Sequence, residues 1–64
     1  MVTINGETVD MAGKTVEEYL SQTNYTRNRI AVEINGAIIP KSQYETTVFQ
    51  DGDQVEIVGF VGGG

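Results

Sequence analysis

The stretch Thr15-Val16-Glu17-Glu18-Tyr19-Leu20 decides the fold, because it begins the one helix of any length that the sequence predicts. The Thr15 hydroxyl can accept the backbone N–H of Glu18 while the Glu18 carboxylate accepts the N–H of Thr15, which is the capping-box pattern. An apolar stripe then recurs at helical spacing, made by Val16, Tyr19, Leu20 and Thr23. We therefore expect a helix from residue 16 to residue 22 or 23, starting just after the break at Gly13.

Before this helix, the sequence predicts a β-hairpin. Met1-Val2-Thr3-Ile4 alternates apolar and polar residues, which places Val2 and Ile4 on one face of a strand. Asn5-Gly6 follows, and both residues tolerate the positive φ that a tight hairpin turn requires. Glu7-Thr8-Val9-Asp10 is the expected return strand, with Val9 directed toward the core.

After the helix, a second hairpin is predicted. Ile30-Ala31-Val32-Glu33-Ile34 alternates again, with its isoleucines and valine inward, and Asn35-Gly36 repeats the turn signal. The next strand, residues 37–39, is stopped by Pro40 and should therefore be short or at a sheet edge, since proline has no N–H for a ladder.

Between and beyond these strands, the sequence predicts loops, one helical turn and a final strand. Residues 24–28 are polar and indicate a loop, in which Arg27 and Arg29 either face solvent or dock an acidic partner. Residues 41–44 suit a single helical turn that points Tyr44 to the core, and residues 45–49, which include Val48, are expected to be extended. Asp51-Gly52-Asp53 is interpreted as a tight turn, because the other ligands of a calcium loop are missing. The final strand, residues 54–58, turns Val55 and Ile57 inward.

The order of these elements defines the fold class. A right-handed crossover through the helix makes the strands on either side of it parallel in one sheet. We expect an α+β, ubiquitin-like β-grasp fold, with one main helix packed across a mixed sheet of four to five strands. The first and last strands should be adjacent and parallel in the centre. Residues 1–58 form the expected domain, and residues 59–64 a flexible glycine-rich tail.

The composition limits what else the chain can be. A chain of 64 residues makes one small domain, and at this size folding buries only about 60% of the surface exposed by the unfolded chain. With no cysteine and no histidine, a disulfide framework is absent and a structural zinc site is essentially excluded. The net charge of −5 disfavours nucleic acid and anionic membranes as partners and favours a partner with a basic surface. No charged segment leads into an apolar run, so we expect a cytoplasmic protein.

The residue types also argue against an enzyme acting alone. Without cysteine or histidine, the usual pairs of nucleophile and base cannot form, and Ser21 and Ser42 lie in no recognisable nucleophile motif. The sequence instead ends in Phe60-Val61-Gly62-Gly63-Gly64. A carboxylate on this tail is a poor electrophile until an ATP-consuming partner adenylates it, and glycine puts no side chain beside the reacting carbonyl or against a narrow channel. The alternative is a frayed end or a linker.

Taken together, these motifs closely resemble the sulfur carriers of thiamine biosynthesis, the ThiS family. The resemblance rests on Ile4-Asn5-Gly6, the helix start at residues 15–20, Val32-Glu33-Ile34-Asn35-Gly36 and Ile38-Ile39-Pro40-Lys41. It rests above all on Gln50-Asp51-Gly52-Asp53-Gln54-Val55-Glu56-Ile57 followed by the glycine tail. It covers essentially the whole chain. The family usually ends in a glycine pair, and this chain has three, so the reactive residue is taken as Gly64.

The resemblance implies a carrier without a cofactor of its own. An E1-like adenylyltransferase would use ATP and magnesium to adenylate Gly64, and sulfur from a cysteine-desulfurase persulfide would then give a terminal thiocarboxylate. Thiazole synthase would take the sulfur. The tail residues Gly62, Gly63 and Gly64 would enter the partner's active site, while Phe60 and Val61, with part of the sheet, would dock.

Two alternatives remain open from the sequence. The nearest is a sulfur carrier for molybdopterin or tRNA thiolation, which uses the same terminus on a usually longer chain. The other is a ubiquitin-like modifier or an interaction module. A modifier would form isopeptide conjugates, and an interaction module would keep its activity without its glycines.

Overall fold

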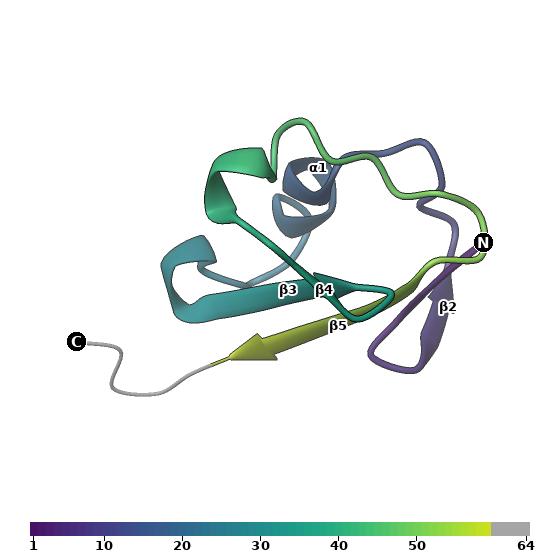
Figure 1. Cartoon of the computed structure of the whole chain (residues 1–64), viewed down its shortest axis with the longest axis horizontal. Coiled ribbons are helices and arrows are strands. Elements are labelled where there is room, and N and C mark those ends of the chain that lie inside the picture. Colours follow the sequence, from purple (N-terminus) through teal and green to yellow (C-terminus); the bar gives the residue numbers. More distant parts are fainter. Residues whose placement is uncertain (60–64) are drawn as a thin grey trace.

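The computed structural model describes residues 1–59 and confirms the β-grasp architecture. One helix packs on one face of a five-stranded mixed sheet whose strand order is β2-β1-β5-β3-β4 (Figure 1). The strands are β1 (Val2–Ile4), β2 (Glu7–Val9), β3 (Ile30–Ile34), β4 (Ala37–Ile39) and β5 (Gln54–Gly59). The helical elements are α1 (Val16–Leu20) and the 3₁₀ turns η1 (Arg27–Arg29) and η2 (Lys41–Gln43).

The sheet has the predicted topology. β5 is central and pairs parallel with β1 and antiparallel with β3. Both predicted hairpins are present, and at both turns the asparagine and the glycine have positive φ: 50° and 82° at Asn5-Gly6, and 52° and 87° at Asn35-Gly36. The strand before Pro40 is indeed at an edge, since β4 pairs only with β3.

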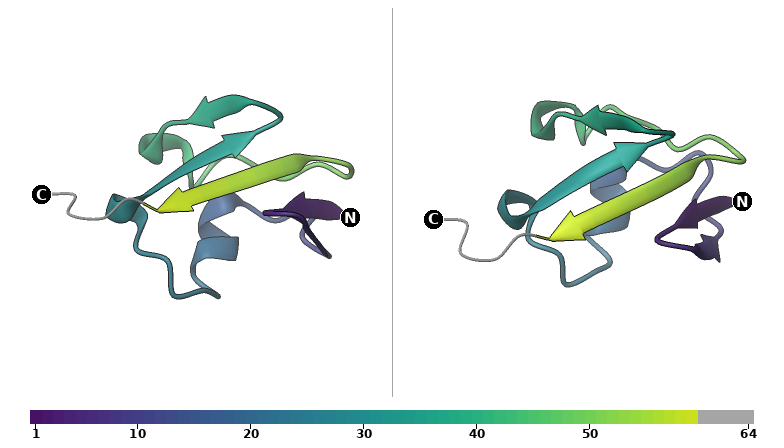
Figure 2. Two further views of the ribbon diagram at one scale, coloured as in Figure 1. Left: turned by 90° about the horizontal axis from the view of Figure 1, so that it is seen from below. Right: turned by 60° about the horizontal axis from the view of Figure 1, so that its bottom comes forward.

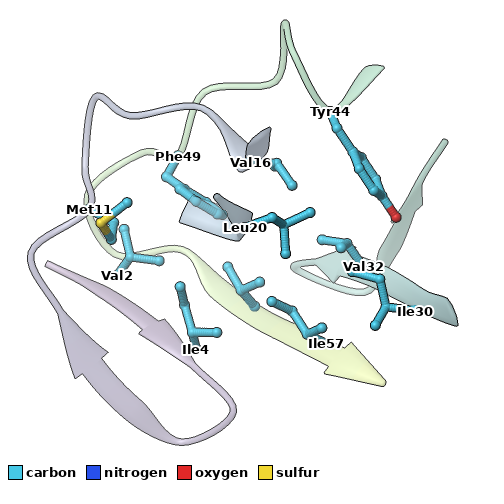
Figure 3. Packing of buried hydrophobic residues seen from close by; sticks show 11 residues of the cluster. Val2, Ile4, Met11, Val16, Leu20, Ile30, Val32, Tyr44, Phe49 and Ile57 are labelled. Carbon is cyan, nitrogen blue, oxygen red and sulfur yellow. The ribbon is translucent and has the colours of Figure 1, made fainter. Parts of the chain in front are cut away.

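The core lies between α1 and the sheet (Figure 3). The inward positions of the strands are buried as predicted at Val2, Ile4, Ile30, Val32, Val55 and Ile57. Ile34 is only partly buried, because it lies toward the end of β3. Val16 and Leu20 reach the core from the helix, and Tyr44 and Phe49 enter it from the connection between η2 and β5.

Helix α1 is shorter than predicted, ending at Leu20 rather than at residue 22 or 23. Beyond it the backbone bonds tighten, since the N–H groups of Gln22 and Thr23 bond to carbonyls three residues back. The Thr23 hydroxyl also donates to the carbonyl of Leu20 at 2.8 Å. Hydroxyl side chains compete with the backbone for these bonds, which is why serine and threonine are weak helix formers.

Residues 45–49 do not form a strand, although the sequence predicted an extended segment. They contain a turn and one isolated bridge between Val48 and Thr15. The carbonyls of Tyr44 and Thr47 instead accept the N–H groups of Glu17 and Val16, at 2.9 and 3.0 Å. The segment thus caps the first turn of α1, whose N–H groups have no partner within the helix.

The predicted loop at residues 24–28 is also more ordered than expected, because η1 begins at Arg27. Within the described part of the chain, no helix is both long and apolar enough to cross a bilayer.

Candidate functional site

The predicted site residues Phe60, Val61, Gly62, Gly63 and Gly64 lie outside the described residues. The structure does describe the strand from which they continue. β5 ends at Gly59, one residue later than predicted, at the end of the sheet opposite the Asp51-Gly52 turn (Figures 1 and 2). β5 and the residues that bond to it therefore determine where the predicted site residues begin.

The start of β5 is bonded to both neighbouring strands. On one side, the N–H of Thr3 donates to the carbonyl of Asp53 at 2.9 Å. On the other, Asn35 bonds to Gln54 twice, through its backbone N–H at 2.7 Å and through its side-chain oxygen, which accepts the Gln54 N–H at 2.9 Å. This end of the strand is fixed by the fold.

A buried carboxylate supports this start. Asp53 is 8% exposed, and its two oxygens accept the N–H of Gln50 at 2.8 Å and the side-chain amide of Asn35 at 3.0 Å. The Asp51-Gly52-Asp53 turn was predicted, but this role of Asp53 was not. The available signal was an acidic residue directly before a strand, because such side chains often bond to nearby backbone N–H groups.

Asn5 holds the strand nearer its other end. β1 ends at Ile4, and Asn5 turns away into the hairpin, but its side chain takes the place of a strand residue. Its amide oxygen accepts the N–H of Ile57 at 2.8 Å, and its amide nitrogen donates to the carbonyl of Ile57 at 3.2 Å. The same nitrogen also donates to the Tyr25 hydroxyl at 3.3 Å. The sequence predicted Asn5 only as a turn residue.

The sheet face opposite α1 is open beside the end of β5. Side chains alternate along a strand, so the residues between the buried positions lie on this face. The strand register brings together Ala31 and Val58, Glu33 and Glu56, and Glu33 and Ile38. Ile38 is 69% exposed and Val58 is 51% exposed. We call Ala31, Glu33, Ile38, Glu56 and Val58 the outer patch; it is apolar with two opposed carboxylates.

Arg27 makes contacts within the fold, although its side chain remains 39% exposed. Its guanidinium lies 5.4 Å from the centre of the Tyr44 ring, 3.3 Å from the Glu17 carboxylate and 3.1 Å from the carbonyl of Lys41, to which it donates. It therefore ties η1 to α1 and η2, whereas Arg29 is exposed.

The residues whose pKa values are shifted make contacts within the folded domain. Burial raises the pKa of Tyr44, opposed by the Arg27 charge, and burial with the charges of Tyr25 and Glu7 raises the pKa of Tyr19. The bonds of Thr15 lower the pKa of Glu18. Within residues 1–59 there is no pocket and no cluster of possible metal ligands. The described residues thus provide the outer patch and the end of β5, from which the chain continues.

Comparisons with known proteins agree with this geometry. The model of the ThiS family matches residues 2–64. The sulfur carrier protein ThiS of Escherichia coli (strain K12) is 38% identical over 53 residues, which are 83% of this chain and 80% of that protein. The crystal structure of a thiamine biosynthesis protein (ThiS) from Geobacter metallireducens matches with a TM-score of 0.78 and 37% identity, covering 98% of this chain and 97% of that one.

A longer relative matches as well. A thiazole synthase of Paramagnetospirillum magneticum is 45% identical over 62 residues, which are 95% of this chain but only 19% of that protein. The family model, the relatives and the solved fold together confirm the resemblance drawn from the motifs, and the chain belongs to the ThiS family.

Proposed function

We propose that this chain is a sulfur carrier of thiamine biosynthesis that bears the sulfur on the carboxylate of Gly64. The observation that carries the proposal is the family match over residues 2–64, which extends through the glycines. The names of the relatives from Escherichia coli and Geobacter metallireducens support both the carrier role and the pathway.

The proposed chemistry takes place on a partner enzyme. An E1-like adenylyltransferase uses ATP and magnesium to join the Gly64 carboxylate to AMP, releasing pyrophosphate. The terminal sulfur of a persulfide, formed on a cysteine desulfurase, then attacks the acyl adenylate and displaces AMP, which gives an acyl disulfide. A thiol, such as free cysteine, reduces the S–S bond, so that a disulfide leaves and the thiocarboxylate remains on Gly64. The chain supplies no catalytic group and binds no cofactor itself.

The chain supplies instead a rigid base and a narrow tail. β5 is the central strand and is paired with β3 along its whole length, up to the pair of Ile30 and Gly59, so the segment that follows Gly59 begins at the end of an ordered strand. The five residues after Gly59 reach roughly 15–20 Å when extended. Gly62, Gly63 and Gly64 carry no side chains, which lets this length enter a closed active site.

Docking is proposed to use Phe60, Val61 and the outer patch. The exposed side chains of Ile38 and Val58 offer apolar contact beside the tail, and the carboxylates of Glu33 and Glu56 favour a partner with basic residues. We propose thiazole synthase as the acceptor of the sulfur, because proteins of that name contain a region similar to this chain. The predicted division into a domain at residues 1–58 and a tail at residues 59–64 is proposed with the boundary one residue later, because β5 includes Gly59. A cytoplasmic location completes the proposal.

Intact mass spectrometry tests this function. The protein is incubated with the E1-like adenylyltransferase, ATP, magnesium, a cysteine desulfurase and cysteine, and then fragmented. We expect a mass increase equal to one oxygen replaced by sulfur, localised to Gly64. An unmodified protein under these conditions contradicts the proposal. Transfer from the thiocarboxylate to thiazole synthase, compared with the large subunit of molybdopterin synthase, then identifies the acceptor.

A further inference from the structure

The neighbouring strands β3 and β1 pair with β5 over different lengths. β3 lies along the whole strand, with register pairs from Ile34 with Val55 to Ile30 with Gly59. β1 pairs only with Gln54 and Val55. β5 therefore continues past the end of β1, which Figure 2 shows as the strand running on toward the C-terminus.

Alternation along the strand decides which backbone groups face the β1 side. The carbonyl of Val55 accepts the N–H of Asn5 at 2.9 Å, and both backbone groups of Ile57 bond to the Asn5 side chain. Backbone groups of successive residues point to opposite edges, so Gly59 is the next residue whose N–H and C=O face this side.

The opposite edge confirms this direction. Asn35 bonds to Gln54 through backbone groups, so the hydrogen-bonded pairs that follow in the antiparallel ladder are Glu33 with Glu56 and Ala31 with Val58. The pair of Ile30 and Gly59 is then a pair without ladder bonds. Gly59 is exposed, and no backbone group in the described part of the chain bonds to it from outside the ladder.

The glycine at this position is not required by contacts inside the fold. A Cβ on Gly59 would lie 3.8 Å from its nearest neighbour, the carbonyl oxygen of Arg29, which is an ordinary contact. Its φ is also outside the left-handed region. An alanine therefore fits, and because a Cβ on a strand projects from the sheet face rather than from its edge, Gly59→Ala leaves the edge unchanged.

We infer that Gly59 opens a strand-addition site, at which an extended main-chain segment of the activating partner pairs with the free edge of β5. One N–H and one C=O that face the same way, at the end of a paired edge, match the spacing of a neighbouring strand. The segment would continue the sheet on the β1 side, beyond Asn5, and align the tail as it leaves the domain. This inference rests on the proposed function, because the partner is the enzyme that receives the tail.

Proline and alanine at residue 59 test the site. Gly59→Pro removes the N–H without removing a bond to β3, whereas Gly59→Ala keeps the N–H. We expect both variants to melt at similar temperatures, and Val58→Pro, which removes a ladder bond to Ala31, to melt lower. In titrations against the E1-like adenylyltransferase, Gly59→Pro should have a Kd about five to ten times that of Gly59→Ala, the effect of one main-chain hydrogen bond.

A backbone variant separates the effect of losing the Gly59 N–H from the steric effect of the proline ring. Ligation of a synthetic C-terminal segment replaces the amide of Gly59 with an ester, which deletes the N–H and keeps every side chain. Because the ester also makes the Val58 carbonyl a weaker acceptor for Ala31, the melting temperatures of the two ligated proteins are compared as well. Weaker binding of the ester than of the ligated all-amide protein supports the inference, and equal Kd values overturn it. Whether the all-amide protein acquires sulfur is measured separately, so failure of the carrier function is not mistaken for failure of the edge.

Discussion

The first residues of β5 are bonded on both edges of the strand, whereas Gly59 at its other end has no backbone partner on the β1 side among residues 1–59. Asp53, directly before the strand, is buried and bonded through both carboxylate oxygens. Gly59 is exposed and is paired in register only with Ile30. We therefore propose different roles for the two ends of the central strand: one end stabilises the fold, and the other binds a second protein.

The two Asn-Gly turns contribute to this difference although they are nearly identical in backbone. Both asparagines have a φ in the left-handed region, and both bond to β5 through their side-chain amides. Asn35 also bonds to the buried carboxylate of Asp53, while the other partner of Asn5 is the hydroxyl of Tyr25, which is 38% exposed. The same dipeptide therefore bonds to a buried carboxylate at one end of β5 and to an exposed tyrosine at the other.

The largest effect is expected from removing Gly63 and Gly64. This deletion should abolish formation of the thiocarboxylate, because the proposed reactive carboxylate is lost. Glycine has no side chain to bury, so the melting temperature should stay within error of the full chain. Mass spectrometry and thermal unfolding check the two parts. A large drop in melting temperature would show that the tail belongs to the fold, and the contrast between the ends of β5 would then be mistaken.

At the anchored end, Asp53→Ala should destabilise the fold. It leaves the N–H of Gln50 and the side-chain amide of Asn35 without their partner, which costs about 1–3 kcal/mol of the free energy of unfolding. Denaturant unfolding measures the loss, with the exposed Glu45→Ala as the control for removing a carboxylate. Equal stability of the two variants would show that the hydrogen bonds of Asp53 do not stabilise the start of β5.

The two asparagines allow a matched comparison of the ends. Asn5→Gly and Asn35→Gly both keep the positive φ that the turns require, and each removes the side-chain bonds to β5. Each should cost about 0.5–1.5 kcal/mol per net bond lost. Hydrogen exchange should accelerate at the Ile57 amide in the first variant and at the Gln54 amide in the second. Uniform acceleration in both would mean that β5 opens as one unit.

These residues also show which features a sequence can reveal. Alternation, the Asn-Gly turns and the Thr15–Glu18 capping box are local signals, and all three predicted structure that is present. The burial of Phe49 and the capping of the first turn of α1 depend on hydrogen bonds between residues 13–17 and the segment at 44–49. Such bonds leave no periodic pattern, so the sequence predicted an extended segment there.

The position of the strand before the predicted site residues was also predictable from the sequence. The strand order placed β5 in the centre, and so placed the departure of the tail. The Asn5 side chain bonds to a residue 52 positions away, and an Asn-Gly dipeptide reads as a turn whether or not its amide has such a partner. The free edge at Gly59 likewise follows from where β1 stops relative to β5, which only the register shows.

The smallest effect is expected at the capping box of α1, which serves as a test far from either end of β5. The N–H of Thr15 donates to the Glu18 carboxylate at 2.8 Å, and this bond, with that of the Thr15 hydroxyl, lowers the pKa of Glu18 below its ordinary value of 4.5. A carboxyl whose pKa is lower in the folded state stabilises the fold above its unfolded pKa, and this contribution is lost as the pH falls through the folded pKa. Glu18→Gln can keep the cap without titrating. Relative to that variant, the wild type should lose a small part of its stability on acidification, and NMR titration should find the Glu18 pKa below 4.5.

Because the capping box has no bond to β5, amide exchange at Gln54 and Ile57 should be the same in both proteins at each pH. A change at either amide would mean that the helix and the two ends of the strand are coupled, and that the ends of β5 cannot be treated as separate regions.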